Sequence, residues 1–506
     1  MRIVMTACLA LSLASPAWAQ ADVQLTDREA AIERIDAFAR QLAESDYAPP
    51  GFSIAIVDRG GPLLVRGYGV SNVETGQLVS EDTAFYNASV TKQFTALAAV
   101  RLEAQGLIDL DASLADFEPE LDLPRRLDPD EITLRGLLTH SAHLGNSSLG
   151  FVTAYIGRLS PEEVYSQIEE HSGFVGDDFR YGNHGYIIVD AILQNHLGLD
   201  WREAVENEVL FPSGMTQTTP RFANNLESEI AYGHEVGEEG WLVIEPKPDS
   251  LLHAAGGMFT TASDSAIWLE LNLNEGVYQG ELRLPASDIR NAHTPIIEQD
   301  RSYGPLQRHQ YAMGWNVGEL DGEVIYEHGG GYTGARAWNT FMPEQGLGVA
   351  ILVNSGTGGN AFSLAVMAQA YDELLGREDA SSEAERRLAE FTPLVEESWQ
   401  QTLEYRADKL SAGSWAPASS ELETVIGRYH SERLGDLMVT AGENGTLAGQ
   451  LGAMQFIFTP DEAPGTFIAN PGPGYEGFIA PWTVRFNRRG EVTGFDWQHR
   501  PFERVE

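Results

Sequence analysis

A serine and a lysine three residues apart are the first residues of this chain that could support a chemical reaction. Ser89 and Lys92 lie in the segment Tyr-Asn-Ala-Ser-Val-Thr-Lys-Gln-Phe, residues 86–94. In a helix, residues three apart share a face, so an ammonium would lie beside a hydroxyl. A serine nucleophile needs such a partner. Lysine is rare in this chain: the other lysines are Lys247 and Lys409, whereas there are 74 acidic residues. A lysine is therefore less expected to stand at this spacing by chance.

Two later clusters add groups that transfer protons and donate hydrogen bonds. Tyr181 and Asn183 form a Tyr-x-Asn motif, and His328 opens a His-Gly-Gly-Gly turn at residues 328–331. Each cluster alone has a structural alternative. Ser89 could cap a helix with Lys92 at the surface, Tyr-x-Asn could be a simple turn, and His328 could begin a glycine turn. The three clusters together favour a catalytic site.

The hydrophobic pattern around these clusters predicts an α+β domain. Buried strands at 51–57 and 63–68 flank a Gly-Gly turn and form a hairpin. The Ser89 segment continues into a helix that ends near Gly106. A helical region covers about 109–260, and strands return at 324–354. We therefore expect an antiparallel sheet built from both ends of the domain, packed against helices that include 27–44 and 362–375.

The chain changes character after Gly376. A charged segment, in which a helical pattern is interrupted at Pro393, leads to a linker-like stretch at 413–420. Short strands with frequent turns follow, which predicts a small all-β barrel or sandwich with Trp482 and Trp497 in its core. The expected divisions are a signal peptide at 1–19, a main domain at 22–378, a helical linker at 379–420 and a β-barrel domain at 421–506. The expected tail strands are 437–440, 446–451, 455–459, 466–469, 483–486 and 492–497.

Composition and the N-terminal segment restrict location and partners. Arg2, an apolar run over 3–14 and Ala17-Trp18-Ala19 are typical of a signal peptide cleaved after Ala19, so we expect a periplasmic or secreted protein. The apolar run is too short to favour a stable membrane span. Cys8, the one cysteine, lies in this segment, so a cleaved protein has no thiol chemistry. A net charge of −41 argues against nucleic acid as a partner.

The three clusters, in this order, resemble the penicillin-recognising serine hydrolases, the group of class C β-lactamases, D-alanyl-D-alanine peptidases, D-aminopeptidases and esterases. Two further stretches match family segments: Leu-Leu-Thr-His-Ser at 137–141 and Ala-Ala-Gly-Gly-Met-Phe-Thr-Thr at 254–261. The resemblance covers about 27–375 and implies a β-lactamase-like transpeptidase fold. From residue 425 the tail is similar to the lipocalin-like domain of some relatives.

The resemblance also implies roles for the clusters. Ser89 would be the nucleophile that forms an acyl-enzyme, with Lys92 and Tyr181 as its proton-transfer groups. A neighbouring ammonium is expected to lower the pKa of a tyrosine. Asn183 would bind the substrate amide and hold Lys92. The backbone amides of Ser89 and Gly331 would form the oxyanion hole, where a donor is typically worth about 3 kcal/mol.

The third cluster departs from the family pattern. Many β-lactamases have Lys-Thr-Gly where this chain has His328, Gly329 and Gly330. The resemblance places His328 and Gly330 at the substrate, but histidine carries little charge at pH 7. This favours peptidase and esterase relatives over recognition of a penicillin-like carboxylate. If protonated His328 binds anions, their kcat/KM should fall as the pH rises through about 6 to 7.

The expected function is a serine hydrolase acting on small peptides, amides or esters, with D-amino-acid substrates among the candidates. A β-lactamase is the alternative enzyme, and a non-enzymatic penicillin-binding or sensor protein is the alternative of another class. No cofactor is expected. His140 and His143 have the spacing of a metal-binding pair, but the sequence shows no evident third ligand. We therefore expect no metal either. Lys92 is the one lysine expected in the active site.

Overall fold

The computed structural model describes residues 17–222, 230–411 and 413–505. The expected signal segment lies outside this range up to residue 16, and helix α1 (Ala17–Leu42) includes the expected cleavage point after Ala19. Cleavage there therefore stays a prediction. None of the helices in the described ranges is long and apolar enough to cross a membrane.

A nine-stranded sheet forms the centre of the main domain, and both ends of that domain supply its strands. Strand β1 (Gly51–Asp58) lies between β2 (Gly61–Asn72) and β17 (Leu347–Val353), with antiparallel pairing on both sides. The sheet order is β12-β13-β14-β15-β16-β17-β1-β2-β3. This confirms the predicted sheet and hairpin. The remaining strands are β3 (Gln77–Leu78), β12 (Ile297–Tyr303), β13 (Leu306–Tyr311), β14 (Asn316–Leu320), β15 (Glu323–Tyr332) and β16 (Ala335–Met342).

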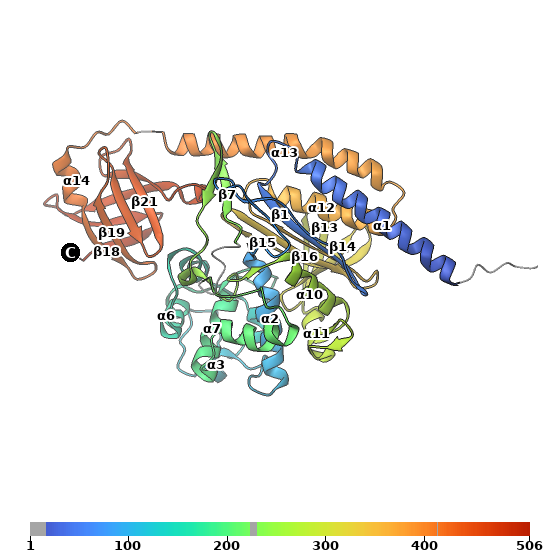
Figure 1. Ribbon diagram of the computed structural model, residues 1–506. Helices are drawn as coiled ribbons and strands as arrows, with labels where there is room; N and C mark the ends of the chain where they lie inside the picture. The colour runs from blue at the N-terminus through green and yellow to red at the C-terminus, as the bar shows by residue number, and fades with distance from the viewer. Residues whose placement is uncertain (1–16, 223–229, 412, 506) are drawn as a thin grey trace, which may run out of the picture.

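The sheet is buried on both faces because strand residues alternate between two cores. Ile54 and Ile56 point into a core shared with α1 and α12 (Gly359–Leu374), whereas Ala55 and Val57 belong to the core of the helical region. Figure 1 shows α1, α12 and α13 on one side of the sheet and the helical region on the other. The other longer helices of that region are α6 (Pro161–His171), α7 (His184–Leu197), α10 (Ala262–Leu273) and α11 (Ala286–His293).

Helix α2 (Thr91–Ala104) passes through the helical core and is buried on nearly all sides. Its buried residues include the polar Lys92 and Gln93 beside apolar ones such as Phe94 and Leu97. The helix ends as predicted, with Gly106 in the left-handed region at φ 72°. The first residues of α2 are therefore held rigidly beside the sheet.

Helix α13 (Ala380–Lys409) differs from the sequence prediction, because it continues through Pro393 without interruption. Proline removes one helical hydrogen bond and strains the preceding turn. Phe391, Val395 and Trp399 are buried at helical spacing on either side of it. Their packing keeps the helical path across the proline.

The tail forms a closed eight-stranded barrel, which confirms the predicted small β-barrel. Trp482 and Trp497 stack inside it, with ring centroids 4.9 Å apart. The pattern located six strands and missed the first and last. The strands are β18 (Gly427–Ser431), β19 (Gly435–Ala441), β20 (Leu447–Leu451), β21 (Met454–Pro460), β22 (Thr466–Asn470), β23 (Ala480–Phe486), β24 (Val492–Trp497) and β25 (Arg500–Arg504).

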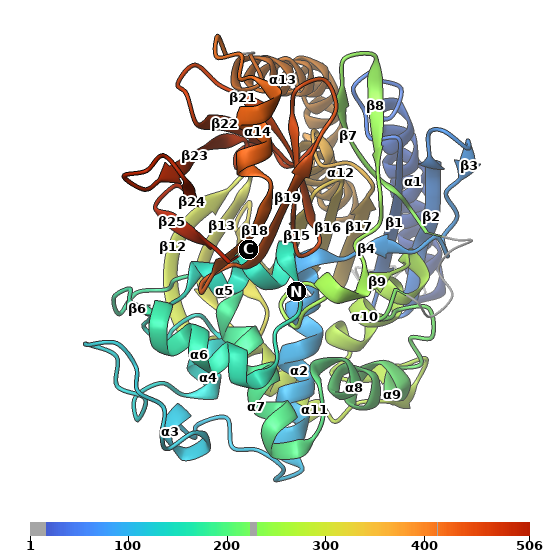
Figure 2. The same ribbon diagram turned by 90° about the vertical axis from the view of Figure 1, so that its left-hand side faces the viewer.

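The barrel packs against the helical region beside α5 (Ser147–Phe151), as Figure 2 shows. We call residues 471–479, between β22 and β23, the barrel loop. Its Phe478 ring lies 5.0 Å from the Tyr155 ring, and the Thr333 hydroxyl donates a 3.1 Å hydrogen bond to the Gly474 carbonyl. The barrel loop thus joins the barrel to the end of β15.

Replacing Gly474 by alanine tests this joint. A methyl group there would lie 2.2 Å from Thr333 Cγ2, whereas at Gly472 it would meet nothing within 4 Å. Both glycines have positive φ, 101° at Gly472 and 80° at Gly474, so an alanine strains the backbone at either position. We expect G474A to lose about 1–3 kcal/mol more of the free energy of unfolding than G472A, measured by urea denaturation. Equal losses would contradict the contact.

Close packing of α7 on α4 (Leu134–Leu138) positions Asn183, the residue just before α7. A methyl group at Gly185 would lie 2.2 Å from the Leu137 carbonyl oxygen. We expect G185A to cost about 1–3 kcal/mol of stability, because backbone must move. Gly173 has open space around it, so G173A should change stability by less than about 0.5 kcal/mol. Thermal denaturation of both variants measures this, and an unchanged G185A would refute the packing argument.

Candidate functional site

Ser89 lies on a short 3-10 turn (Ala88–Val90) between β4 (Phe85–Tyr86) and α2. Ala88 has a φ of 44°, an uncommon conformation for a residue with a side chain. The N-cap of α2 is Val90, and no side chain caps that end. The alternative in which Ser89 caps the helix is therefore wrong, and its hydroxyl is free for another partner.

That partner is Lys92. Its Nζ donates hydrogen bonds to Ser89 Oγ at 3.1 Å, Asn183 Oδ1 at 2.9 Å and the Ala255 carbonyl at 2.7 Å. The side chain has no solvent exposure. Burial, and secondarily the charge of Lys247, holds the pKa of Lys92 well below its usual range. In the charged form, all three ammonium donors of Lys92 are used. The lowered pKa makes the loss of one of these protons easier, and the neutral amine that results can accept a proton from a neighbour.

Tyr181 completes the group around Ser89. Its ring centroid lies 4.9 Å from Lys92 Nζ, and its hydroxyl shares a hydrogen bond with Ser89. The residue is 43% exposed, yet the dense surroundings of the hydroxyl raise the pKa of Tyr181 to about 12. Desolvation outweighs the Ser89 hydrogen bond, which acts in the opposite direction. The expected lowering of the tyrosine pKa by the ammonium is thus wrong, and Tyr181 holds its proton at neutral pH.

Strand β15 brings the His-Gly-Gly-Gly segment against the Ser89 turn. A methyl group at Gly330 would lie 2.4 Å from the Asn87 carbonyl oxygen and 3.1 Å from Ser89 N. Glycine at this position is therefore what allows the strand to pass so close. Gly331 follows and lines the cleft together with Ser89, so the two amides expected to form an oxyanion hole belong to adjoining segments.

His328 is buried and uncharged at neutral pH. Its Nδ1 lies 2.8 Å from the Gly329 carbonyl, and its exposed fraction is 2%. Burial, followed by the charge of Lys92, lowers the pKa of His328 to about 3. The hypothesis of a protonated His328 that binds anions near pH 6 to 7 is therefore wrong, and its side chain offers a neutral imidazole instead.

Two clefts meet at Ser89 and Tyr181. The first has a volume of about 580 Å³ and the second about 1000 Å³. Asn183 lines the first, whereas His328 and Gly330 line the second. The six residues lining both are Ser89, Tyr155, Arg180, Tyr181, Gly331 and Tyr332. The structure therefore brings every site residue predicted from the sequence to one place.

Lys247 also lines the first cleft, which contradicts the expectation of Lys92 as the one lysine there. Its Nζ donates a 3.1 Å hydrogen bond to the Tyr86 hydroxyl, and burial lowers the pKa of Lys247 to about 7. No motif surrounds this residue. The rarity of lysine in this acidic chain is the one feature of the sequence that could have pointed to Lys247.

The barrel reaches the second cleft. Gly474 of the barrel loop lines it, and the hydroxyl oxygens of Tyr475 and Tyr332 lie 3.4 Å apart. Tyr332 lines both clefts. The tail thus contributes to the rim of the site, which the sequence did not predict.

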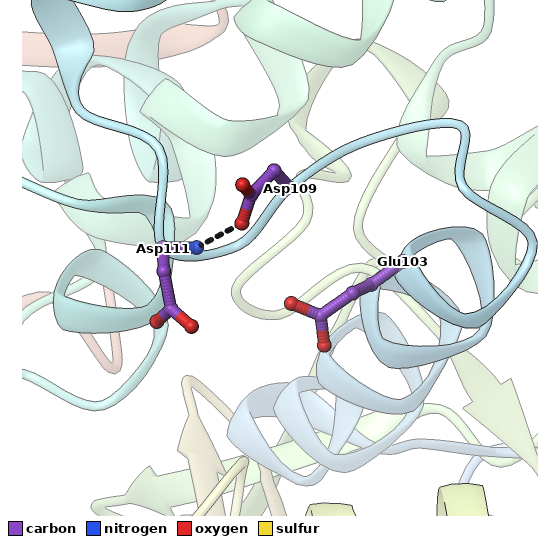
Figure 3. Close-up of side chains that lie close together, drawn as sticks. All are labelled: Glu103, Asp109 and Asp111. Atoms are coloured by element: carbon purple, nitrogen blue, oxygen red, sulfur yellow. Dashed lines mark hydrogen bonds between the residues drawn. The ribbon is translucent and has the colours of Figure 1, made fainter.

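One cluster of acidic side chains within the described residues has metal-like spacing, and it lies at the end of α2 (Figure 3). It contains Glu103, Asp109 and Asp111, with Asp111 N donating to Asp109 Oδ1 at 2.9 Å. Arg135 already contacts this cluster, 2.7 Å from Glu103 and 2.6 Å from Asp111. The guanidinium supplies the positive charge there.

The chain is similar to several known proteins in sequence and in fold. "Protein flp" of Staphylococcus aureus (strain N315) is 25% identical over 307 residues, 60% of this chain and 59% of that protein. The match thus spans about 59% of the length of this relative. The octameric penicillin-binding protein homologue from Pyrococcus abyssi has a TM-score of 0.58 at 21% identity, covering 93% of this chain and 99% of that one. SurE with D-Leu has a TM-score of 0.53 at 21% identity, covering 94% and 100%.

The two structural matches show the same fold over both the main domain and the barrel. The family model described as "Beta-lactamase" matches residues 31–371, which include Ser89, Lys92, Tyr181 and His328. This span agrees with the extent of the resemblance seen in the sequence, and it covers more than half of the chain. The protein therefore belongs to the β-lactamase family.

Proposed function

We propose that the protein is a serine hydrolase that forms an acyl-enzyme on Ser89 and acts on small peptides, amides or esters. The observation that carries this proposal is the buried Lys92 amine, which is hydrogen-bonded to Ser89 Oγ and to Asn183 Oδ1. A lysine with a lowered pKa beside a serine is an activated nucleophile pair. Membership of a serine-hydrolase-type family supports the same reaction class.

The geometry supports a definite sequence of proton transfers. Lys92 in its deprotonated form, which the lowered pKa favours, accepts the Ser89 proton as Oγ attacks the substrate carbonyl, and the amides of Ser89 and Gly331 stabilise the oxyanion. The Tyr181 phenol, which holds its proton at neutral pH, protonates the leaving group and is then reprotonated from Lys92. Water then attacks the acyl carbonyl and gives a proton to neutral Lys92. Lys92 passes this proton to Ser89 Oγ as the acyl–oxygen bond breaks, which releases the acid and restores the starting state.

Two observations support our proposal for the substrate class. The similar SurE structure contains D-Leu, which makes D-amino-acid peptides or amides first candidates. His328 is neutral where many β-lactamases carry a lysine, so β-lactam hydrolysis is the second candidate. A non-enzymatic binding protein would not need the proton-transfer groups around Ser89. We also propose export to the periplasm or medium after cleavage at Ala19.

Replacing Ser89 or Tyr181 tests the reaction directly. We expect S89A to lower kcat/KM by at least about 1000-fold, because the nucleophile is lost. Y181F should lower kcat by about 100-fold or more, because the ring stays while the acid is removed. Ser382 is exposed on α13 and lines neither cleft, so S382A is the control serine and should stay within about threefold of the unsubstituted protein.

The substrate panel decides among the alternatives. It contains p-nitrophenyl acetate, D- and L-alanine p-nitroanilides, a D-alanyl-D-alanine peptide and a chromogenic cephalosporin. Turnover of the cephalosporin alone would make the protein a β-lactamase. Covalent labelling of Ser89 without turnover would identify a binding protein, and full activity in S89A would disprove the mechanism.

A further inference from the structure

Lys247 is fixed in the first cleft by its surroundings. Proline residues flank it on both sides, and Arg202 donates hydrogen bonds to the carbonyls of Asp249 at 3.0 Å and Leu252 at 2.9 Å. The Lys247 ammonium lies 4.3 Å from the centroid of the Tyr332 ring and donates to the Tyr86 hydroxyl. The side chain is thus held at one position in the cleft wall.

The two buried lysines differ in how many of their donors are used. Lys92 donates to three acceptors, which is all that an ammonium can serve. Among the residues that the structure describes, Lys247 donates to one acceptor, Tyr86, and the ion pair between a lysine and a carboxylate is formed by Lys409, not by Lys247. A buried ammonium without a counter-charge is costly, so an anion in the cleft would stabilise it.

The lining of the first cleft favours such an anion. Besides His184 and His253, it contains one lysine and one arginine, Lys247 and Arg180, and no aspartate or glutamate. This is unusual in a chain with 74 acidic and 33 basic residues. The cleft is therefore a basic site in an acidic protein, and it contains Ser89.

We propose that Lys247 is the specificity-determining residue that binds the carboxylate of the substrate in the Ser89 cleft. Lys247 lies in a different segment from His328 and supplies the positive charge that His328 does not provide. The proposal rests on the proposed hydrolase function and narrows it to substrates with a free carboxylate. A charge-assisted hydrogen bond from the ammonium, with the tyrosine rings alongside, fixes the orientation of the substrate.

The groups that face Lys247 predict how binding depends on pH. Tyr86 and Tyr332 keep their protons because burial raises their pKa values, and His253 stays neutral because burial lowers its pKa well below 6.5. Arg180 also lines this cleft. Lys247, whose pKa is about 7, is charged below that value and neutral above it. Carboxylate binding should therefore weaken as the pH rises through about 7.

A binding experiment tests this without requiring catalysis. The full-length S89A protein is titrated with N-acetyl-D-alanine and with N-acetyl-D-alanine amide, which differ in the carboxylate alone, at pH 6 and pH 8.5. We expect the carboxylate to bind at least about tenfold more tightly than the amide at pH 6, and this preference to shrink at pH 8.5. Ligand-observed NMR measures both dissociation constants.

Variants at two lysines complete the experiment. S89A/K247M should lose the preference and its pH dependence, whereas S89A/K409M, at an exposed helix end, should keep both. No preference for the carboxylate in S89A, or a preference that survives in S89A/K247M, would overturn the proposal. If K247M does not fold, the pH dependence in S89A decides. Failure of Ser89 catalysis appears separately in the turnover assays, so the two proposals are distinguishable.

Discussion

The buried ammonium of Lys92 is the interaction on which the site depends. Its three hydrogen bonds join the Ser89 turn, the residue before α7 and the segment before β9 (Phe259–Thr260), which lie far apart in the sequence. Burying this group is unfavourable unless every donor has an acceptor, so packing of the helical region and positioning of Ser89 are parts of one arrangement. The same burial lowers the pKa of Lys92 and thereby makes its amine useful as a proton acceptor.

Burial sets the protonation states of the other groups as well. Desolvation keeps Tyr181 a phenol and His328 a neutral imidazole, so neither carries charge at neutral pH. The positive charge available to a substrate then comes from Lys247 and Arg180 in the first cleft. A β-lactamase-family site without a lysine in its third cluster can in this way still contain a cation. The barrel forms part of the wall of the second cleft, because the barrel loop packs on Tyr332 and Thr333 at the end of β15.

The sequence pattern predicts the parts of this structure that depend on local order along the chain. The Ser89, Tyr181 and His328 clusters were assigned to one site, and buried runs such as 51–57 located the sheet. The pattern does not predict features that depend on contacts between residues far apart in the sequence. Lys247 gains its role from Tyr86 and Tyr332, which are remote in sequence, and the pKa of His328 depends on burial that no spacing reveals. Strands β18 and β25 lack a clear strand pattern because they are rich in polar residues. Helix α13 crosses Pro393 because its apolar neighbours are buried.

The central claim is that Ser89 becomes acylated during turnover. The most direct measurement is rapid acid quenching of the protein with p-nitrophenyl acetate, followed by intact mass and peptide mapping. The account predicts a transient single acetyl group on the peptide that contains Ser89, absent in S89A and lost as the substrate is consumed. Turnover with no adduct at Ser89, or a stable adduct on Lys92 or Lys247 in its place, would contradict it.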